Sequence, residues 1–133
     1  MRVYPDTNVL VSAVATRGLC ADLFQAILSN HELLIGETVL VELARVLARK
    51  LHLAPSTITE WDGFLRRQGE IIPTGPLLRV KVRDPQDRAI LAEAVAGRAD
   101  VLVTGDRDLL VLAARPPLRI LSPRDFWELL RSV

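Results

Sequence analysis

The chain has 133 residues, of which half are hydrophobic, and 17 basic against 16 acidic residues give a formal net charge of +1. These values fit one domain with a substantial core and exclude an intrinsically disordered chain, while the charge neither demands nor excludes an anionic partner. A single cysteine, Cys20, excludes an intrachain disulfide and a zinc site built on cysteines.

The first half of the chain alternates short apolar runs with amphipathic ones. Three strands are predicted, at residues 2–5, 32–36 and 70–73. Four helices alternate with these strands, at residues 8–14, 19–28, 37–51 and 56–68. Thr16-Arg17-Gly18 breaks the first helix, and Pro55 suits the first position of the fourth.

The second half begins with the least regular stretch, residues 75–87, which predicts a connector into the next helix. That helix is predicted over residues 87–99, with an inward face formed by four aliphatic side chains, Ile90, Leu91, Ala94 and Val95. The segment DVLVTG (100–105) is the clearest buried strand. The remaining elements are a helix over 107–114, a strand over 118–121 and a last helix that Ser122 caps before Pro123.

Strands that alternate with helices imply parallel pairing through right-handed crossovers, with helices on both faces of the sheet. We therefore predict an α/β fold of one domain, residues 1–133, around a parallel sheet of four to five strands. No apolar run approaches the length of a membrane span, and MRVYPDTN lacks the apolar region of a signal peptide. A cytoplasmic protein without a membrane partner is the expectation.

Acidic residues gather where the predicted strands end. Asp6 follows the first strand, Asp106 and Asp108 follow the strand at 100–105, and Asp84 and Asp87 open the helix that leads into it. Ligands of open parallel sheets bind at the carboxyl ends of the strands. The alternative is structural, because acids also cap helices, and this alternative is favoured for Asp84, which precedes a proline.

Glu42 lies inside the helix predicted over 37–51, between Val41 and Leu43 and at the edge of the apolar face. A glutamate among aliphatic residues is most often exposed. If it is buried, its carboxylate needs a cation or another partner, and no Lys or Arg is an obvious candidate in the sequence.

Several carboxylates in one pocket repel each other and persist only if some are protonated or a divalent cation is bound. Oxygen ligands without a nearby histidine or cysteine favour Mg²⁺ or Mn²⁺ over zinc. Such an ion, held by carboxylates, typically serves phosphate chemistry. The acids together therefore predict a metal site for phosphoryl hydrolysis.

Four segments in order, DTN after the first strand, ELARVL, DPQDRAIL and VTGDRDLL, resemble those of the PIN-domain ribonucleases, closest to VapC-like toxins of toxin–antitoxin pairs. The resemblance covers nearly the whole chain. It implies a three-layer fold and a Mg²⁺- or Mn²⁺-dependent endoribonuclease acting on single-stranded RNA. Asp6, Glu42, Asp87 and Asp106 match the family's acidic quartet, which is catalytic and binds the metal. Asp84, Asp108, Asn8 and Thr104 match supporting positions.

The resemblance also implies partners, because toxins of this family are usually homodimers that an antitoxin segment inhibits. Three arginines, Arg83, Arg88 and Arg107, flank the acids and are candidates for contacts to the RNA backbone. Salt bridges to neighbouring acids are the alternative reading of these arginines. Gly36 stands where the family often has a serine or threonine helix cap.

Two other functions remain open at this stage. A PIN fold with a weakened site would act as an RNA- or protein-binding module, although the intact acids speak against it. A haloacid-dehalogenase-like phosphatase also has an aspartate at the end of its first strand, but it requires a second aspartate two residues later, where this chain has Asn8. A receiver domain requires a late lysine, and the two lysines, at 50 and 81, come too early.

Overall fold

The computed structural model describes residues 1–75, 85–112 and 118–132. Five strands lie in these ranges: β1 (Arg2–Pro5), β2 (Glu32–Gly36), β3 (Glu70–Ile72), β4 (Val101–Val103) and β5 (Arg119–Leu121). Seven helices lie in the same ranges: α1 (Thr7–Ala15), α2 (Leu19–Asn30), α3 (Glu37–Arg49), α4 (Pro55–Gln68), α5 (Pro85–Ala96), α6 (Arg107–Leu110) and α7 (Pro123–Arg131).

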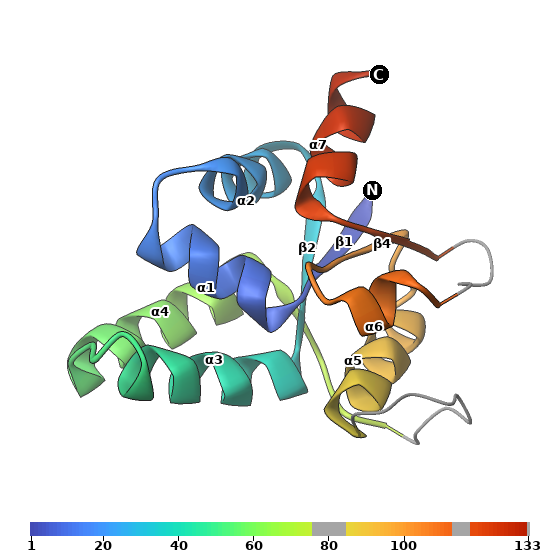
Figure 1. Ribbon diagram of the computed structural model, residues 1–133. Helices are drawn as coiled ribbons and strands as arrows, with labels where there is room; N and C mark the ends of the chain where they lie inside the picture. The colour runs from blue at the N-terminus through green and yellow to red at the C-terminus, as the bar shows by residue number, and fades with distance from the viewer. Residues whose placement is uncertain (76–84, 113–117, 133) are drawn as a thin grey trace.

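All five strands pair in parallel in one sheet, in the order β3-β2-β1-β4-β5. Helices α1 to α4 lie on one side of this sheet, and α5 and α6 lie on the other (Figure 1). The arrangement follows from right-handed crossovers, because the chain moves from β1 through β2 to β3 in one direction and then returns to β4 in the other. The predicted α/β fold, a parallel sheet between two helical layers, is confirmed.

The three inner strands are apolar on both faces, as expected for a parallel sheet that helices cover on both sides. Val3 and Tyr4 of β1 and Leu102 of β4 are each 0% exposed. On the helix predicted over 37–51, Leu43 and Leu47 of the apolar stripe are buried in the same core. The core therefore fills both layers and fixes the strand ends relative to the helices that begin there.

The helix predicted over 87–99 differs from the structure in its ends and its orientation. It begins earlier, at Pro85, and ends at Ala96, because Arg98 takes a left-handed conformation with φ 55°. Val95, predicted to face inward, is 47% exposed, whereas Glu93 is 0% exposed. The inward prediction for Val95 is wrong, because the buried face of α5 extends toward Glu93 and ends before Val95.

The helix predicted over 107–114 is also shorter than expected, since α6 ends at Leu110 and residues 113–117 lie outside the described ranges. The last helix begins as predicted, with Ser122 as its N-cap and Pro123 in its first turn. Within the described ranges no single helix has the length and apolar composition to cross a membrane, and α1 and α2 have them only together, as a pair bent by 104°.

Candidate metal centre

The site begins where two neighbouring parallel strands end. β1 pairs with β4 so that Pro5 lies opposite Val103, and the backbone N–H of Asp6 donates to the carbonyl oxygen of Val103 at 2.8 Å. Beyond this point α1 follows β1 on one face of the sheet, and α6 follows β4 on the other (Figure 1). Such a switch of face opens a crevice at the carboxyl edge, where ligands of open α/β sheets bind.

Asp6 lies in this crevice and is 5% exposed. The hydroxyl of Thr104 donates to its Oδ2 at 2.7 Å, and the backbone N–H of Thr7 donates to its Oδ1 at 2.7 Å. Burial raises the pKa of Asp6, the two hydrogen bonds oppose this rise, and the charge of Asp106 adds to it. Asp6 therefore caps α1 and at the same time stays a desolvated carboxyl beside a second acid.

Three further carboxylates converge at the same edge. Asp87, Asp106 and Asp108 each place one carboxylate oxygen within 4.8 Å of the others. Asp87 is buried in the first turn of α5, whereas Asp108 is exposed on α6. Asp106 caps α6 by accepting from the N–H of Asp108 at 2.8 Å, and its own N–H donates to the Thr104 hydroxyl at 3.0 Å. Asp106 therefore caps α6, which was the structural alternative for this acid, and also belongs to the acidic group.

This donor set fits a hard divalent cation, because all three ligand atoms are carboxylate oxygens and no sulfur or imidazole is among them. Asp108, expected only in support, stands inside the group. The oxygens of Asp6 and Glu42 are not among the three that lie within 4.8 Å of one another. Of the predicted quartet, Asp87 and Asp106 thus belong to the close group with Asp108, whereas Asp6 and Glu42 stand outside it.

Glu42 is half-buried on α3, and its hydrogen-bond partners among the described residues are neutral. The hydroxyl of Thr7 donates to its Oε2 at 3.0 Å, and the side-chain amide of Gln86 donates to the same oxygen. These partners neighbour Asp6 and Asp87 in the chain, so the two bonds hold Glu42 beside both acids. Sequence reasoning missed Thr7 and Gln86, although both lie within the DTN and DPQD segments.

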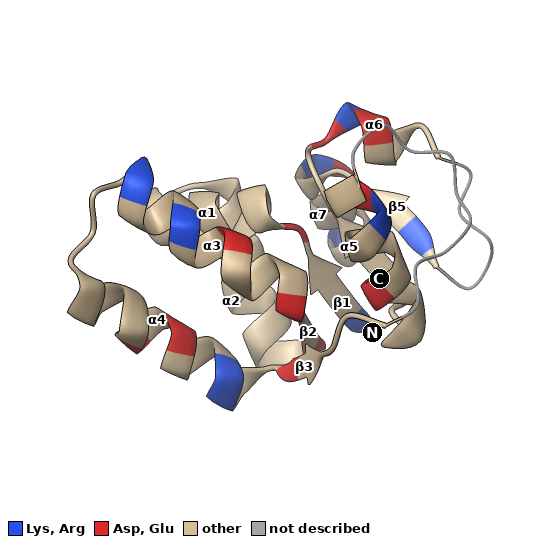
Figure 2. Cartoon of the chain, turned by 90° about the horizontal axis from the view of Figure 1, so that it is seen from below, with Lys and Arg blue, Asp and Glu red and all other residues tan. Residues whose placement is uncertain are grey.

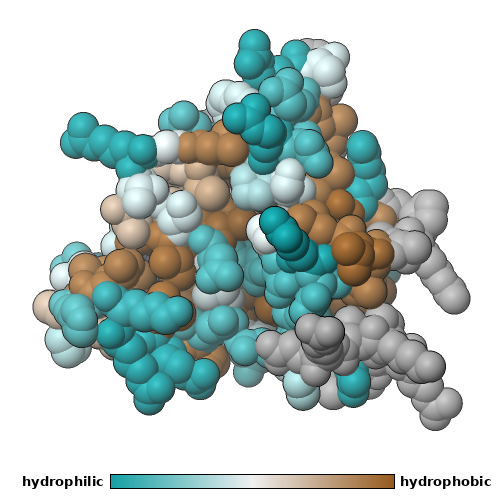
Figure 3. Space-filling view, in the orientation of Figure 1, coloured by the Kyte–Doolittle hydropathy of each residue, from teal (hydrophilic) through white to brown (hydrophobic). Residues whose placement is uncertain are grey.

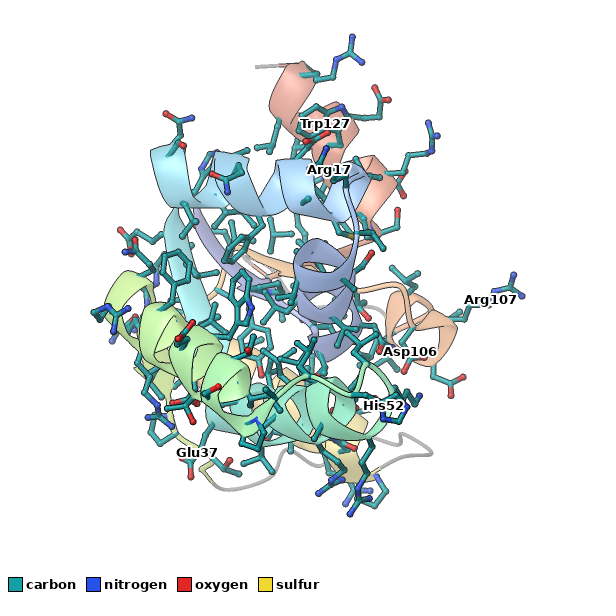
Figure 4. All side chains as sticks on the ribbon, turned by 90° about the vertical axis from the view of Figure 1, so that its left-hand side faces the viewer. Arg17, Glu37, His52, Asp106, Arg107 and Trp127 are labelled. Carbon is teal, nitrogen blue, oxygen red and sulfur yellow. The ribbon has the colours of Figure 1, made fainter. Side chains whose placement is uncertain are left out.

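The remaining predicted site residues differ in their burial and in their contacts. Thr104 is buried and bonded to Asp6, whereas Asn8 is exposed on α1. Arg107 is exposed and points away from the body of the protein (Figure 4). Arg88 is half-buried, and its Nε is buried without a hydrogen-bond partner among the described residues. Arg83 and Asp84 lie outside the described residues.

The views of the whole molecule agree with this geometry. In the view from below, acidic positions lie on α3 on one side of β1 and on α5 and α6 on the other (Figure 2). On the face shown in Figure 3, hydrophilic side chains form a central band between two apolar areas.

A further buried acid, Glu93, was not predicted as a functional or structural residue. Its Oε1 accepts from the Tyr4 hydroxyl at 2.6 Å. Its Oε2 accepts from the N–H of Thr38 at 3.1 Å, from the Thr38 hydroxyl at 2.5 Å and from the Thr74 hydroxyl at 2.7 Å. Burial, followed by the bond to Glu93, raises the pKa of Tyr4 far above its usual range. Gly36 makes room for this cluster, because an added Cβ would lie 2.1 Å from Glu93 Oε1.

Fold and site together define the class: an all-parallel α/β protein with carboxylates clustered at its switch point. The PIN-domain family model matches residues 2–108, and the chain belongs to this family. The predicted family is thereby confirmed.

Two crystal structures with similar chains are complexes. One is VapBC2 from Rickettsia felis bound to a DNA fragment from their promoter, with 21% identity and a TM-score of 0.65 over 92% of this chain and 98% of that chain. The other is DNA-bound VapBC from Salmonella typhimurium, with 18% identity and a TM-score of 0.63 over the same shares of 92% and 98%. At these identities the likeness shows the fold. A search of curated protein sequences found no match.

Proposed function

We propose that this PIN domain is an endoribonuclease that requires Mg²⁺ or Mn²⁺ and hydrolyses phosphodiester bonds of single-stranded RNA. The observation that carries the proposal is the approach of Asp87, Asp106 and Asp108 to within 4.8 Å of one another, beside the buried Asp6. Membership of the PIN family supports the same conclusion.

A cation explains why these carboxylates tolerate each other. At the spacing of Asp87, Asp106 and Asp108, each pair of full charges repels by about 3 kcal/mol or more at an effective dielectric near 20. Protonation or a divalent ion relieves this repulsion, and an all-oxygen donor set favours Mg²⁺ or Mn²⁺. Such an ion neutralises charge at a scissile phosphate and makes water a better nucleophile.

The residues take different parts in this proposal. Asp87 and Asp106 are the central metal ligands, and Asp108 joins them from the first turn of α6. Asp6 and Glu42 complete the acidic crevice, each oriented by hydrogen bonds from neighbouring side chains or backbone. Arg88 and Arg107 are the described basic residues next to these acids, and they are suited to contact phosphates of the RNA backbone.

We further propose that the protein is the toxin of a toxin–antitoxin pair, cytoplasmic and homodimeric. The similarity of its fold to chains of two VapBC complexes supports a cognate antitoxin protein as a partner. This role predicts that expression in a host bacterium arrests growth, and that Asp87→Asn relieves the arrest at an equal level of protein. Arrest that persists in the variant would count against a nuclease-dependent toxin.

Cleavage of a labelled single-stranded RNA by the purified protein tests the enzymatic proposal. We expect cleavage with Mg²⁺ or Mn²⁺, loss of cleavage in EDTA, and loss in Asp87→Asn. Asp22→Asn is the matched control, because Asp22 is an exposed acid in the first turn of α2. RNA that is bound but stays intact with either ion would refute the enzyme and leave a binding module, and hydrolysis of phosphomonoesters alone would point to a phosphatase.

A further inference from the structure

A groove of about 330 Å³ lies along α3, beside the candidate metal centre. Thr38, Val41 and Glu42 of α3 line it together with Thr74, which follows β3. Its volume is at the lower end of the range of roughly 300–1,000 Å³ for small-molecule sites, so it suits a single nucleotide rather than a longer segment. Glu42 belongs both to this groove and to the acidic crevice, so a nucleotide bound here would lie next to the candidate metal ligands.

Glu93 determines which hydrogen-bonding groups the groove offers to a ligand. The hydroxyls of Thr38 and Thr74 both donate to Glu93 Oε2, at 2.5 Å and 2.7 Å, and their oxygens lie 3.3 Å apart. A carboxylate only accepts hydrogen bonds, and a hydroxyl has one proton. Both protons are therefore committed to Glu93, and the two hydroxyls offer only lone pairs to a ligand in the groove.

The charges and the apolar surface of the groove narrow its ligand further. Glu37 and Glu42 line it with two acidic side chains against one basic side chain, Arg45, which disfavours a phosphate group. Val41 is 58% exposed and gives the groove an apolar wall. An uncharged flat group with a hydrogen-bond donor on its edge fits this combination of acceptors and apolar surface.

We propose that this groove binds one nucleotide of the RNA substrate through a hydrogen-bond donor of that nucleotide, which the hydroxyls of Thr38 and Thr74 accept. The donor is an N–H group of the base or the 2′-hydroxyl of the sugar. The inference rests on the proposed nuclease function and names the feature of the substrate that the site reads. Glu93 is a positioning residue in this scheme, since it acts through the two hydroxyls.

The test uses the RNA that the wild-type protein cleaves, with the main cleavage position mapped in a random-sequence single-stranded RNA. Each nucleotide around that position is replaced in turn, either by a base analogue that lacks its amino group or by its 2′-deoxy form. We expect one replacement to lower kcat/KM by about 3- to 10-fold, the effect of one lost hydrogen bond between neutral groups. If the base analogue lowers kcat/KM, the donor is a group of the base, and if the 2′-deoxy form lowers it, the donor is the 2′-hydroxyl.

Variants of Thr74 and Glu93 then test whether this loss of kcat/KM arises in the groove. Thr74→Val removes one of the two acceptors and should weaken the discrimination between the parent RNA and the donor-lacking RNA, whereas Thr74→Ser keeps the hydroxyl and should keep the discrimination in full. In Glu93→Gln the side-chain amide can itself donate to the hydroxyls, so they are no longer obliged to donate, and the discrimination should weaken. A stabilisation by Mn²⁺ equal to that of the wild type shows that the metal centre is intact in each variant.

The possible results separate the two proposals. If the wild type cleaves no RNA with either ion, the nuclease proposal fails and this inference fails with it. If the wild type cleaves RNA but no donor replacement changes kcat/KM, or Thr74→Val discriminates as the wild type does, only the inference about the groove is overturned.

Discussion

Replacing Gly36 by alanine would place a methyl group inside the cluster around Glu93. Gly36 lies at the junction of β2 and α3 with φ −71°, a conformation that alanine adopts freely, so any effect must come from packing. The added Cβ would lie 1.9 Å from the hydroxyl oxygen of Tyr4 and 2.1 Å from Glu93 Oε1. These two atoms are bonded to each other at 2.6 Å, so the methyl group would enter an existing hydrogen bond.

Two contributions determine how far Gly36→Ala lowers the free energy of unfolding. Overpacking of a core costs about 1–3 kcal/mol, and loss of a hydrogen bond to a charged group costs about 1.5–3 kcal/mol. Together they predict that Gly36→Ala lowers the free energy of unfolding by about 3–6 kcal/mol. For a domain of this size each kcal/mol corresponds to roughly 3–4 °C, so the melting temperature should fall by roughly 10–20 °C.

Thermal unfolding followed by circular dichroism measures this change. Gly63→Ala in α4 is the matched control, because its added Cβ would meet only the flexible end of Arg67, at 3.2 Å. Alanine stabilises a helix interior by about 0.5–1 kcal/mol relative to glycine, so this control should melt slightly higher than the wild type. A melting temperature of Gly36→Ala within about 2 °C of the wild type, well below the expected change, would refute the close packing of the cluster.

Three further predictions address the site and its supports. Asp108→Asn should reduce the rise in melting temperature that Mn²⁺ causes, whereas Asp125→Asn, also an exposed first-turn acid, should not; equal shifts in both would remove Asp108 from the ligand group. Thr104→Val loses the hydroxyl that binds Asp6 and should destabilise the fold by about 1–3 kcal/mol, while Thr104→Ser should retain most of the stability; urea unfolding that separates neither variant from the wild type would contradict this. Ser122→Ala removes the N-cap of α7, so urea unfolding should show a loss of about 1 kcal/mol, and an unchanged midpoint would show that the cap contributes nothing.

The acids at the strand ends could be placed from the sequence because one rule governs them. Asp6 and Asp106 follow two apolar runs, and the carboxyl ends of parallel strands meet at one edge of a sheet. The register of β1 and β4 then places Asp6 beside Thr104, and Asp106 two residues further along. A pattern local to each strand was therefore sufficient, once the strands were taken as parallel neighbours.

The contacts of Glu42 could not be placed in the same way. Its partners, Thr7 and Gln86, are 35 and 44 positions away in the chain. Whether their side chains reach Glu42 depends on how α3 packs against α1 and α5, and hydrophobic periodicity carries no information about this packing. The sequence showed only that a carboxylate stood at the edge of an apolar face and would need a partner.

Glu93 shows the same limit more sharply. Periodicity favoured Val95 as a buried residue and gave no indication that Glu93 is buried. In the structure Glu93 is buried and Val95 is exposed. Hydrogen-bond donors from β1, α3 and the segment after β3 compensate the cost of burying the carboxylate. Those donors are Tyr4, Thr38 and Thr74, up to 89 positions away, so no window of sequence around Glu93 contains them.

Two of the buried carboxylates, Glu93 and Asp6, differ in the groups that surround them. Glu93 accepts four hydrogen bonds from neutral donors, the buried hydroxyl of Tyr4 and three groups of Thr38 and Thr74, which stabilise a carboxylate at this position. Asp6 accepts two, and the charge of Asp106 faces it, so burial and repulsion together raise its pKa. A cation between Asp6 and Asp106 would replace the repulsion between the two carboxylates by attraction to the ion, and this attraction would favour the charged form of Asp6. The crevice at the strand ends, and not the better-satisfied cluster around Glu93, is therefore where a divalent ion gains most from binding.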